Sequence, residues 1–177
     1  MEELKALLEV RNGFYGFESA LHLYPFETVG DDIGLLDWNK YTLWISAYKG
    51  LASDGFYFAE DLFGSQFCMK ADGVYLFDPE VASSEKIAKS INEWCSLILK
   101  DYEFLTGYTL AHAWQKKNGK IPIGYRLIPK IPFVLGGGFE VDNLYMERSQ
   151  VALNARANIA LQIKDLPDGS CINMKFS

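Results

Sequence analysis

The sequence contains few residues of the types that most often bind metals or form disulfides. Among 177 residues there are three cysteines and two histidines. Cys68, Cys95 and Cys171 are odd in number and form no Cys-x-x-Cys motif, which favours reduced thiols in a cytoplasmic protein. His22 and His112 lie far apart in the sequence and outside metal-ligand spacing of the cysteines, so no zinc pattern is present. We therefore expect neither a metal nor another cofactor.

Long apolar runs are also missing, and we expect no secretory leader. No apolar run reaches the ~18 residues that a membrane-spanning helix requires. The segment MEELKALLEV is acidic and amphipathic, and it lacks the basic start and apolar centre of a signal peptide. We therefore expect a cytoplasmic protein without a membrane partner. Because 49% of the residues are apolar and 15% are aromatic, the chain can bury enough surface to fold, and its length suits one domain over residues 1–177.

The short motifs of common enzyme classes are incomplete. Gly64-Ser65-Gln66 lacks the second glycine of a nucleophile elbow, and the glycines at 136–138 are not followed by the residues of a phosphate-binding loop. Glu60 and Asp61 are adjacent, but neighbours on a strand point to opposite faces and cannot share a substrate. The sequence thus predicts no catalytic residues and no enzymatic activity. An enzyme with a Tyr- and Trp-lined pocket would need converging polar groups, which the sequence does not display.

Positive charge is scarce in the first half of the chain. Residues 1–80 contain fourteen Asp or Glu and five Lys or Arg, whereas residues 81–177 contain nine and twelve. An acidic surface repels phosphate backbones, so direct binding of nucleic acid is not expected. Such a surface would attract a basic protein and speed its encounter with this chain. The same charge also serves solubility, and composition alone leaves both interpretations open.

The pattern of apolar residues predicts both helices and strands in the first half. We expect a helix over residues 2–10, a strand over 17–24 and an acidic loop over 26–36. Asp37 is a candidate cap for a helix that stops at Gly50 and carries Tyr41, Trp44, Ile45 and Tyr48. Strands are expected over 56–60, 67–70 and 74–77, the last two as a hairpin.

The second half is expected to begin with the longest helix. It starts at Ser83 or Ser84, carries an apolar stripe at spacings of three and four, and ends at Gly107. A shorter helix follows over 110–117, then edge strand and loop over the proline-rich 121–138. Alternation over 151–163 favours a strand, although the alanines there leave a helix open. A turn at 166–169 and a strand over 170–176 complete an α+β fold, with a central mixed, mostly antiparallel sheet flanked by helices.

Three segments together resemble the SUKH superfamily, the Smi/Knr cell-wall-assembly-regulator group. The first is RNGFYGFESALHLYPF, with Asn-Gly between an N-terminal helix and a strand. The second is DGVYLFDPE, an aromatic strand that ends in Asp, and the third is SINEWCSLIL, an amphipathic helix with a Trp. Their order and spacing are similar to the core of that family over residues 1–106. The family's usual Leu-Pro near the first helix is not evident here, and residues 107–177 go beyond the common core as an extension packed on it or completing it.

The resemblance implies an α+β domain that works by binding. Bacterial members of the family are typically immunity proteins that bind a delivered toxin, often a nuclease, and block it. The family has no shared catalytic residues. We therefore expect an immunity-type protein that occludes a cognate toxin without catalysis. The alternative is a non-catalytic interaction or regulatory module with a housekeeping partner.

Two kinds of residue are candidates for the partner-binding surface. Acidic side chains would steer a basic toxin, and the candidates are Asp31, Asp32, Glu60, Asp61, Asp72 and Asp78. Aromatic side chains would anchor it, and the candidates are Trp38 and Trp44, since Trp is enriched in binding hot spots. The helical spacing of Tyr41, Trp44 and Tyr48 is more often that of a buried core, so a structural role for these residues stays open.

Overall fold

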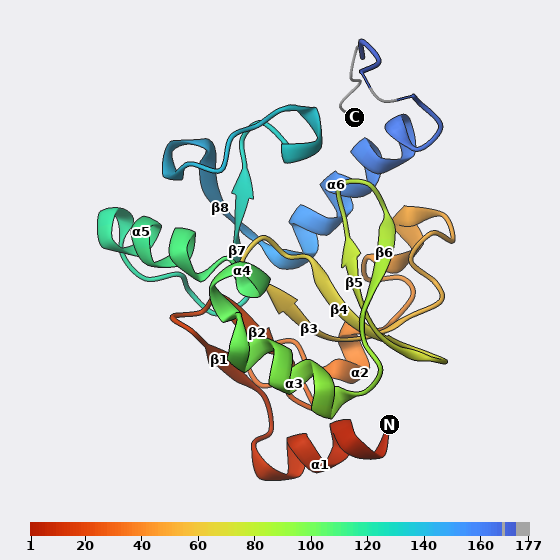
Figure 1. Cartoon of the computed structure of the whole chain (residues 1–177), viewed down its shortest axis with the longest axis vertical. Helices are drawn as coiled ribbons and strands as arrows, with labels where there is room; N and C mark the ends of the chain where they lie inside the picture. The colour runs from red at the N-terminus through yellow and green to blue at the C-terminus, as the bar shows by residue number, and fades with distance from the viewer. Residues whose placement is uncertain (168, 173–177) are drawn as a thin grey trace.

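The chain folds around a six-stranded antiparallel sheet (Figure 1). In the computed structural model, which describes residues 1–167 and 169–172, the strands follow chain order and each pairs with the next. They are β1 Phe14–Gly16, β2 Leu21–Leu23, β3 Phe56–Asp61, β4 Gln66–Lys70, β5 Gly73–Asp78 and β6 Ser83–Ala88. Two further strands, β7 Tyr125–Pro129 and β8 Leu144–Arg148, form a separate antiparallel pair. The expected α+β class with a mostly antiparallel central sheet is confirmed.

Helices and aromatic side chains cover both faces of this sheet. On one face, Trp94 packs against Phe58 and Phe67, with ring centroids 5.0 and 5.4 Å away. On the other, the ring centroids of Trp44 and Tyr57 are 4.6 Å apart. Since both faces are covered, β3 carries successive apolar residues rather than an alternating pattern. The helices are α1 Glu2–Val10, α2 Leu35–Trp38, α3 Ile91–Lys100, α4 Tyr102–Thr106, α5 Tyr108–Asn118 and α6 Ser149–Ile163, with 3-10 turns η1 Ile45–Tyr48, η2 Phe133–Leu135 and η3 Val141–Asn143.

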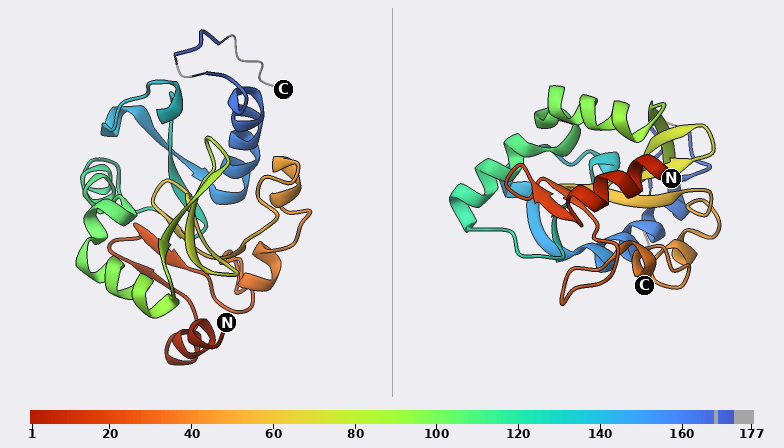
Figure 2. Two further views of the ribbon diagram at one scale, coloured as in Figure 1. Left: turned by 45° about the vertical axis from the view of Figure 1, so that its right-hand side comes forward. Right: turned by 90° about the horizontal axis from the view of Figure 1, so that it is seen from below.

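The smaller sheet joins the larger one just beyond β3. The N–H of Leu127 donates to the carbonyl of Leu62 at 3.1 Å, and a second apolar cluster forms around these residues with Leu144 and Trp114. From β8 the chain returns across the main sheet as α6, which ends near the opposite end of the molecule from α1 (Figures 1 and 2). Residues of α6 enter the main core, namely Leu153, Ala157 and Ala160. The described part of residues 107–177 therefore contributes to both cores.

Several predicted elements are confirmed. The helix over 2–10, the strand over 56–60, the hairpin of β4 and β5 and the helix over 110–117 all form. Gly107 also ends a helix, because its φ of 73° lies in the left-handed region that glycine adopts freely. Residues 121–138 hold one strand, β7, which pairs on one side with β8.

The predicted strand over 17–24 is wrong in its first half. Phe17, Glu18 and Ser19 have φ between 51° and 69°, a left-handed conformation, and only residues 21–23 are strand. The turn contains no glycine or proline, so no local signal marks it. Two side chains of α5 contact this turn. Gln115 donates to the carbonyl of Glu18 at 2.7 Å, and His112 Nδ1 lies 3.0 Å from the Glu18 carboxylate.

The predicted helix from Asp37 to Gly50 is also wrong. Asp37 lies within the four-residue α2, whose N-cap is Gly34, and the chain then turns before η1. The indole of Trp44 donates to the carbonyl of Trp38 at 3.0 Å, a bond that a continuous helix would not allow. Core packing of the aromatic side chains thus overrides their helical spacing. The acidic segment before α2 is mostly loop, with one isolated bridge between Val29 and Asp32.

The helix predicted as the longest begins later than expected and is not continuous, because α3 ends at Lys100 and α4 begins at Tyr102; among the described residues α6 is longer. Residues 83–88 form β6, which pairs with β5 from Asp78 opposite Ser83 to Val74 opposite Ala88. The helix α3 starts after Ser90, whose hydroxyl accepts the N–H of Glu93 at 3.1 Å. This is a serine N-cap of the usual type, six or seven residues after Ser84 or Ser83, the starts that the sequence favoured.

The strand favoured for residues 151–163 is wrong, and the helix left open there is what forms. The buried residues of α6 follow helical spacing and include Ala152, Leu153, Arg156, Ala157 and Ala160. Ala157 and Ala160 of this face belong to the main core. The strand predicted over 170–176 lies mostly outside the described residues, and 170–172 are not strand.

Candidate functional site

One candidate site is a set of polar side chains buried where β2, β3 and β7 meet. Glu60 lies at its centre with 1% of its surface exposed. Arg126 Nη2 lies 2.7 Å from Glu60 Oε1, and Ser149 Oγ donates to the same oxygen at 3.1 Å. His22 Nδ1 lies 3.2 Å from that oxygen, and Gln66 Nε2 donates to Oε2 at 3.2 Å. The carboxylate is thus surrounded by donors from four parts of the chain.

The electrostatics of this buried network favour an ionised Glu60. Burial raises the pKa of the carboxyl group, but the Arg126 guanidinium and the bond to His22 outweigh it and set the pKa to about 2. The other ring nitrogen of His22 lies 2.9 Å from Asp32 Oδ1, and the Tyr15 ring stacks on the imidazole with centroids 4.1 Å apart. The network ties the strands together and leaves Glu60 no free surface for a ligand, although His22 Nε2, Arg126 Nε and Arg126 Nη2 have no hydrogen-bond partner among the described residues.

The second candidate site is a cleft on the other side of β3, which we call the acidic cleft. Because neighbouring residues of a strand point to opposite faces, Asp61 enters this cleft while Glu60 enters the buried network. The cleft has a volume of about 510 Å³, which is in the range of small-ligand sites. Its lining residues are Asp61, Phe63, Ser65, Leu76, Asp78, Pro79, Glu80, Val81, Phe104, Leu105, Phe133, Val134, Phe139 and Arg156.

Two carboxyl groups in the acidic cleft are buried and have raised pKa values. Burial raises the pKa of Asp61 to about 7, although Oδ1 accepts the N–H groups of Phe63 at 2.9 Å and Ser65 at 2.8 Å. Burial also raises the pKa of Glu80, whose Oε2 accepts the N–H of Val134 at 3.0 Å. Each carboxyl group therefore fixes a piece of the cleft wall.

A buried arginine from α6 lies beside these carboxyl groups. Arg156 is 4% exposed, and its Nη2 lies 3.7 Å from Glu80 Oε1, which is beyond hydrogen-bond range. Its Nη1 donates instead to the carbonyl of Phe63. Among the residues that the structure describes, Glu80 Oε1 and Arg156 Nε have no hydrogen-bond partner. The cleft thus holds polar atoms that this part of the chain does not satisfy.

Aromatic side chains form the mouth of the acidic cleft. Phe104 of α4 is 82% exposed and Phe139 is 67% exposed. Phe139 stacks on Phe133 with ring centroids 4.1 Å apart, and Phe63 meets Phe133 edge to face at 5.3 Å. Exposed aromatic rings around a buried polar floor are typical of the anchor positions of protein interfaces.

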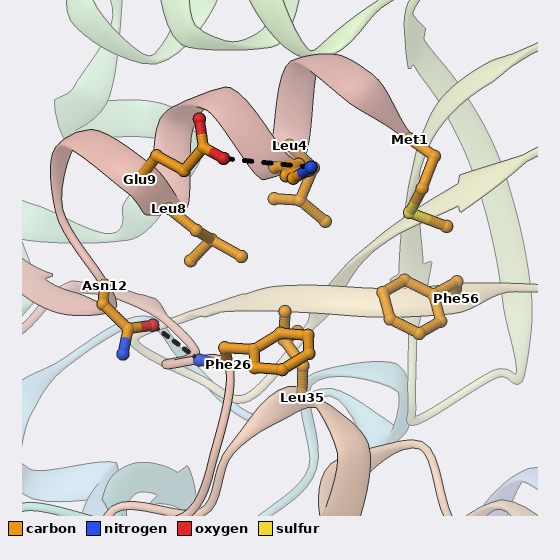
Figure 3. Close-up of a pocket in the computed structure, with 9 residues that line it drawn as sticks. Met1, Leu4, Leu8, Glu9, Asn12, Phe26, Leu35 and Phe56 are labelled. Carbon is orange, nitrogen blue, oxygen red and sulfur yellow. Dashed lines mark hydrogen bonds and ion pairs between the residues drawn. The ribbon is translucent and has the colours of Figure 1, made fainter.

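A separate apolar groove lies beneath α1 (Figure 3). Leu4 and Leu8 of the helix face Phe26, Leu35 and Phe56 across a volume of about 450 Å³. The polar groups at its edge are paired, since Lys5 Nζ lies 3.9 Å from a Glu9 carboxylate oxygen and Asn12 accepts the N–H of Phe26 at 2.8 Å. The groove can therefore accept an apolar group but offers little to orient a charged one.

The structure separates the acidic residues predicted to bind a partner. Asp61 and Asp78 line the acidic cleft. Glu60 is buried in the polar network with Asp32 at its edge, so the prediction of Glu60 as a surface charge is wrong. Asp31 is exposed and 3.9 Å from Arg148, and Asp72 is exposed at the β4–β5 turn, 2.7 Å from Lys86.

The predicted tryptophan anchors are wrong, because both side chains belong to the core. Trp38 is 1% exposed and Trp44 is 0% exposed. Trp38 donates its indole N–H to Gln66 at 2.8 Å, so its polar atom is also used internally. The core role that the helical spacing left open is the one that the structure shows for Trp44 and Tyr48.

Sequence analysis missed most of the acidic cleft. Glu80 and Arg156 were not candidates, nor were the rim residues Phe104 and Phe139. The one local signal was Asp78-Pro79-Glu80, two carboxylates around a proline directly after a strand. The remaining residues come from segments that only the tertiary fold brings together.

Comparisons with known proteins identify the fold and no more. No protein-family model matches the chain, and no curated protein matches it. The crystal structure of Atu4351 from Agrobacterium tumefaciens superimposes with a TM-score of 0.55, covering 89% of this chain and 75% of that one at 11% identity. At this identity the likeness concerns the arrangement of the backbone.

Two general properties of the described residues bear on function. None of the helices in residues 1–167 and 169–172 combines the length and apolarity that a bilayer crossing requires. Within the same residues, no three His, Cys, Asp or Glu side chains are grouped so that they could hold a metal ion.

Proposed function

We propose that this protein acts in the cytoplasm as an immunity-type inhibitor that binds a basic toxin at the acidic cleft and blocks it by occlusion, without catalysis. The observation that carries the proposal is the exposure of Phe104 and Phe139 at the mouth of a cleft that contains buried carboxyl groups. Solvent-exposed phenylalanine rings cost free energy in water, and a partner that covers them recovers it.

The carboxyl groups of the cleft suit a binding surface better than a reactive centre. Asp61 accepts two backbone N–H groups and Glu80 accepts one, so each is held in place as part of the wall. A general acid or base needs to exchange its proton with a substrate, and hydrogen bonds to the wall oppose that exchange. The resemblance of residues 1–106 to the SUKH superfamily supports the same proposal, because its bacterial members are typically inhibitors of toxins.

A second candidate function is acid–base catalysis in the same cleft. The specific observation in its favour is that Asp61 and Glu80 both have raised pKa values and line one cavity. Perturbed carboxyl groups in a cleft are a feature of many active sites. We rank it second because an inhibitor needs no turnover and uses the exposed rim, which catalysis does not explain.

Affinity capture from the native cell tests the proposal when it is done with matched variants. The first variant, Phe104→Asp with Phe139→Asp, places charge on the cleft rim. The control, Phe26→Asp, places one such charge on a half-exposed phenylalanine of the groove beneath α1, and the single variants Phe104→Asp and Phe139→Asp match it in charge. We expect a basic protein to co-elute with the wild type and the control but not with the rim variant. Co-expression of the captured protein should then harm cells unless this chain is present.

Three other outcomes would decide against parts of the proposal. Capture that is lost only in the groove variant would place the docking face beneath α1. A captured protein that is harmless when expressed alone would favour a housekeeping partner. Protection that disappears in Asp61→Asn while capture persists would favour catalysis in the cleft.

A further inference from the structure

We propose that the acidic cleft receives one arginine side chain of the protein partner, with its guanidinium beside Glu80. This inference rests on the proposed function and specifies the chemistry that the site recognises. The starting observation is that Glu80 is 4% exposed, lines the cleft, and has one carboxylate oxygen without a hydrogen-bond partner among the described residues. A buried oxygen of this kind costs free energy until a donor reaches it.

The internal arginine does not satisfy this oxygen. Arg156 Nη2 stays 3.7 Å from Glu80 Oε1, while Nη1 is held by the carbonyl of Phe63. Glu80 lines the cleft, but the unpaired oxygen exposes less than 1 Å² of surface, so a donor from solvent reaches it only when the side chains around it move. The cleft therefore contains an acceptor that has a cation at ion-pair distance but no hydrogen-bond donor among the described residues.

The balance of charge in the cleft favours a cation. Its lining includes three carboxyl groups, Asp61, Asp78 and Glu80, and one cationic group, Arg156. They come from β3, the end of β5, the turn after it and α6. Lys and His do not occur among these lining residues. A guest with one positive charge would bring the site close to neutrality.

The aromatic walls favour arginine over lysine. The planar guanidinium stacks on ring faces and can donate two parallel bonds to a carboxylate, whereas an ammonium group is a hydrated point charge. Phe139 packs one face on Phe133 and is 67% exposed, and Phe63 borders the same cavity. A volume of about 510 Å³ accommodates a side chain of this length.

Binding of a cation in this cleft has a defined pH dependence. Asp61 has a pKa of about 7, so it is largely neutral at pH 6 and largely ionised at pH 8. A cation binds the ionised form better, and binding therefore releases a proton. We expect the affinity for the guanidinium to rise by about fivefold between pH 6 and pH 8, with Asp78, Glu80 and Arg156 as the other charged groups that face the site.

Titration with small arginine analogues tests the inference without the partner. The probes are the N-acetyl amides of arginine, lysine and norleucine, followed through the amide signals of Phe63, Ser65 and Val134 in ¹H–¹⁵N spectra. We expect saturable shifts for the arginine compound, weaker ones for lysine and none for norleucine. Glu80→Gln keeps the acceptor for Val134 and should weaken arginine binding about tenfold. Asp72→Asn, an exposed carboxylate outside the cleft, is the matched control and should change nothing.

Two results would overturn the inference and leave the proposed function standing. One is equal binding of norleucine and arginine, which would mean that only the apolar walls are recognised. The other is no arginine-dependent shift in the folded wild type while the partner is still captured through Phe104 and Phe139. Arginine binding without any captured partner would contradict the proposed function instead.

Discussion

The guanidinium of Arg126 in β7 lies 2.7 Å from the carboxylate of Glu60 in β3, and both side chains are almost completely buried. The pair joins the small sheet to the large one at a point where neither charge can reach water. The attraction between such charges is strong, but so is the cost of removing them from water. The pair therefore stabilises the fold only when both charged side chains are present.

Replacement of Arg126 alone should be far more damaging than replacement of the pair. Arg126→Met leaves Glu60 charged and buried, and we expect it to lower the free energy of unfolding by about 3–5 kcal/mol. The double variant with Glu60→Gln should recover much of that loss. Urea denaturation of the two variants and the wild type measures the difference. Equal losses in the single and double variants would show that packing, rather than charge, sets the cost.

Asp61 should make the protein less stable as the pH rises towards neutrality. Its folded-state pKa of about 7 lies above the ordinary value of a carboxyl group. A raised pKa contributes stability that is present below the unfolded-state pKa and is lost as the pH rises through the folded-state value. The substituted side chain in the Asp61→Asn variant stays neutral at every pH. The loss of stability between about pH 4 and pH 7 should therefore be smaller in this variant than in the wild type. Urea midpoints at several pH values test this, and parallel profiles for both proteins would contradict it.

Glu60 should make the protein less stable as the pH falls, which is the opposite of the effect of Asp61 and occurs at lower pH. Its folded-state pKa of about 2 lies below the ordinary value, because of Arg126 and His22. Its contribution is therefore present above the unfolded-state pKa and is lost as the pH falls from about 4.5 towards 2. Circular dichroism during acid titration should show unfolding in this range for the wild type. A Glu60→Gln variant, less stable at neutral pH, should lose less stability over the same range.

Substitution by phenylalanine should destabilise the protein by different amounts at the two buried tryptophans Trp44 and Trp94. Trp44 donates its indole N–H to the carbonyl of Trp38 at 3.0 Å, whereas Trp94 Nε1 has no partner among the described residues. Both side chains are at most 2% exposed, so Trp→Phe removes a similar volume from each. We expect Trp44→Phe to cost about 1–2 kcal/mol more than Trp94→Phe, since only the former leaves a carbonyl unpaired. Chemical denaturation of the two variants gives the comparison.

Elements stabilised by local interactions could be predicted from the sequence. The hairpin of β4 and β5 follows from alternation around a short turn, and α1 follows from its apolar stripe. Residues 83–88 form a strand only because β5 lies beside them, and their sequence spacing is also compatible with a helix. The turn at 17–19 depends on contacts from α5. Contacts outside the segment itself therefore decided these elements: the neighbouring strand β5 for β6, and the distant helix α5 for the turn.

The candidate site could be predicted only in part. Asp61 and Asp78 follow strands and were recognised as acidic, but the pKa of Asp61 depends on burial that no local pattern reports. Glu60 is as polar as its neighbour Asp61, so the sequence does not distinguish them. In the structure Arg126 and Ser149 bind the Glu60 carboxylate and bury it. Phe104, Phe139 and Arg156 come from three separate segments, and only the tertiary fold brings them to one cavity.

The position of Arg126 along the chain also constrains the order of events during synthesis. A nascent polypeptide that has left the ribosome only as far as residue 106 already contains Glu60 and the six strands of the main sheet. It lacks the cation that neutralises Glu60 and the α6 residues that complete the core. We expect stable tertiary structure to form only after residues up to Ala160 have emerged from the ribosome.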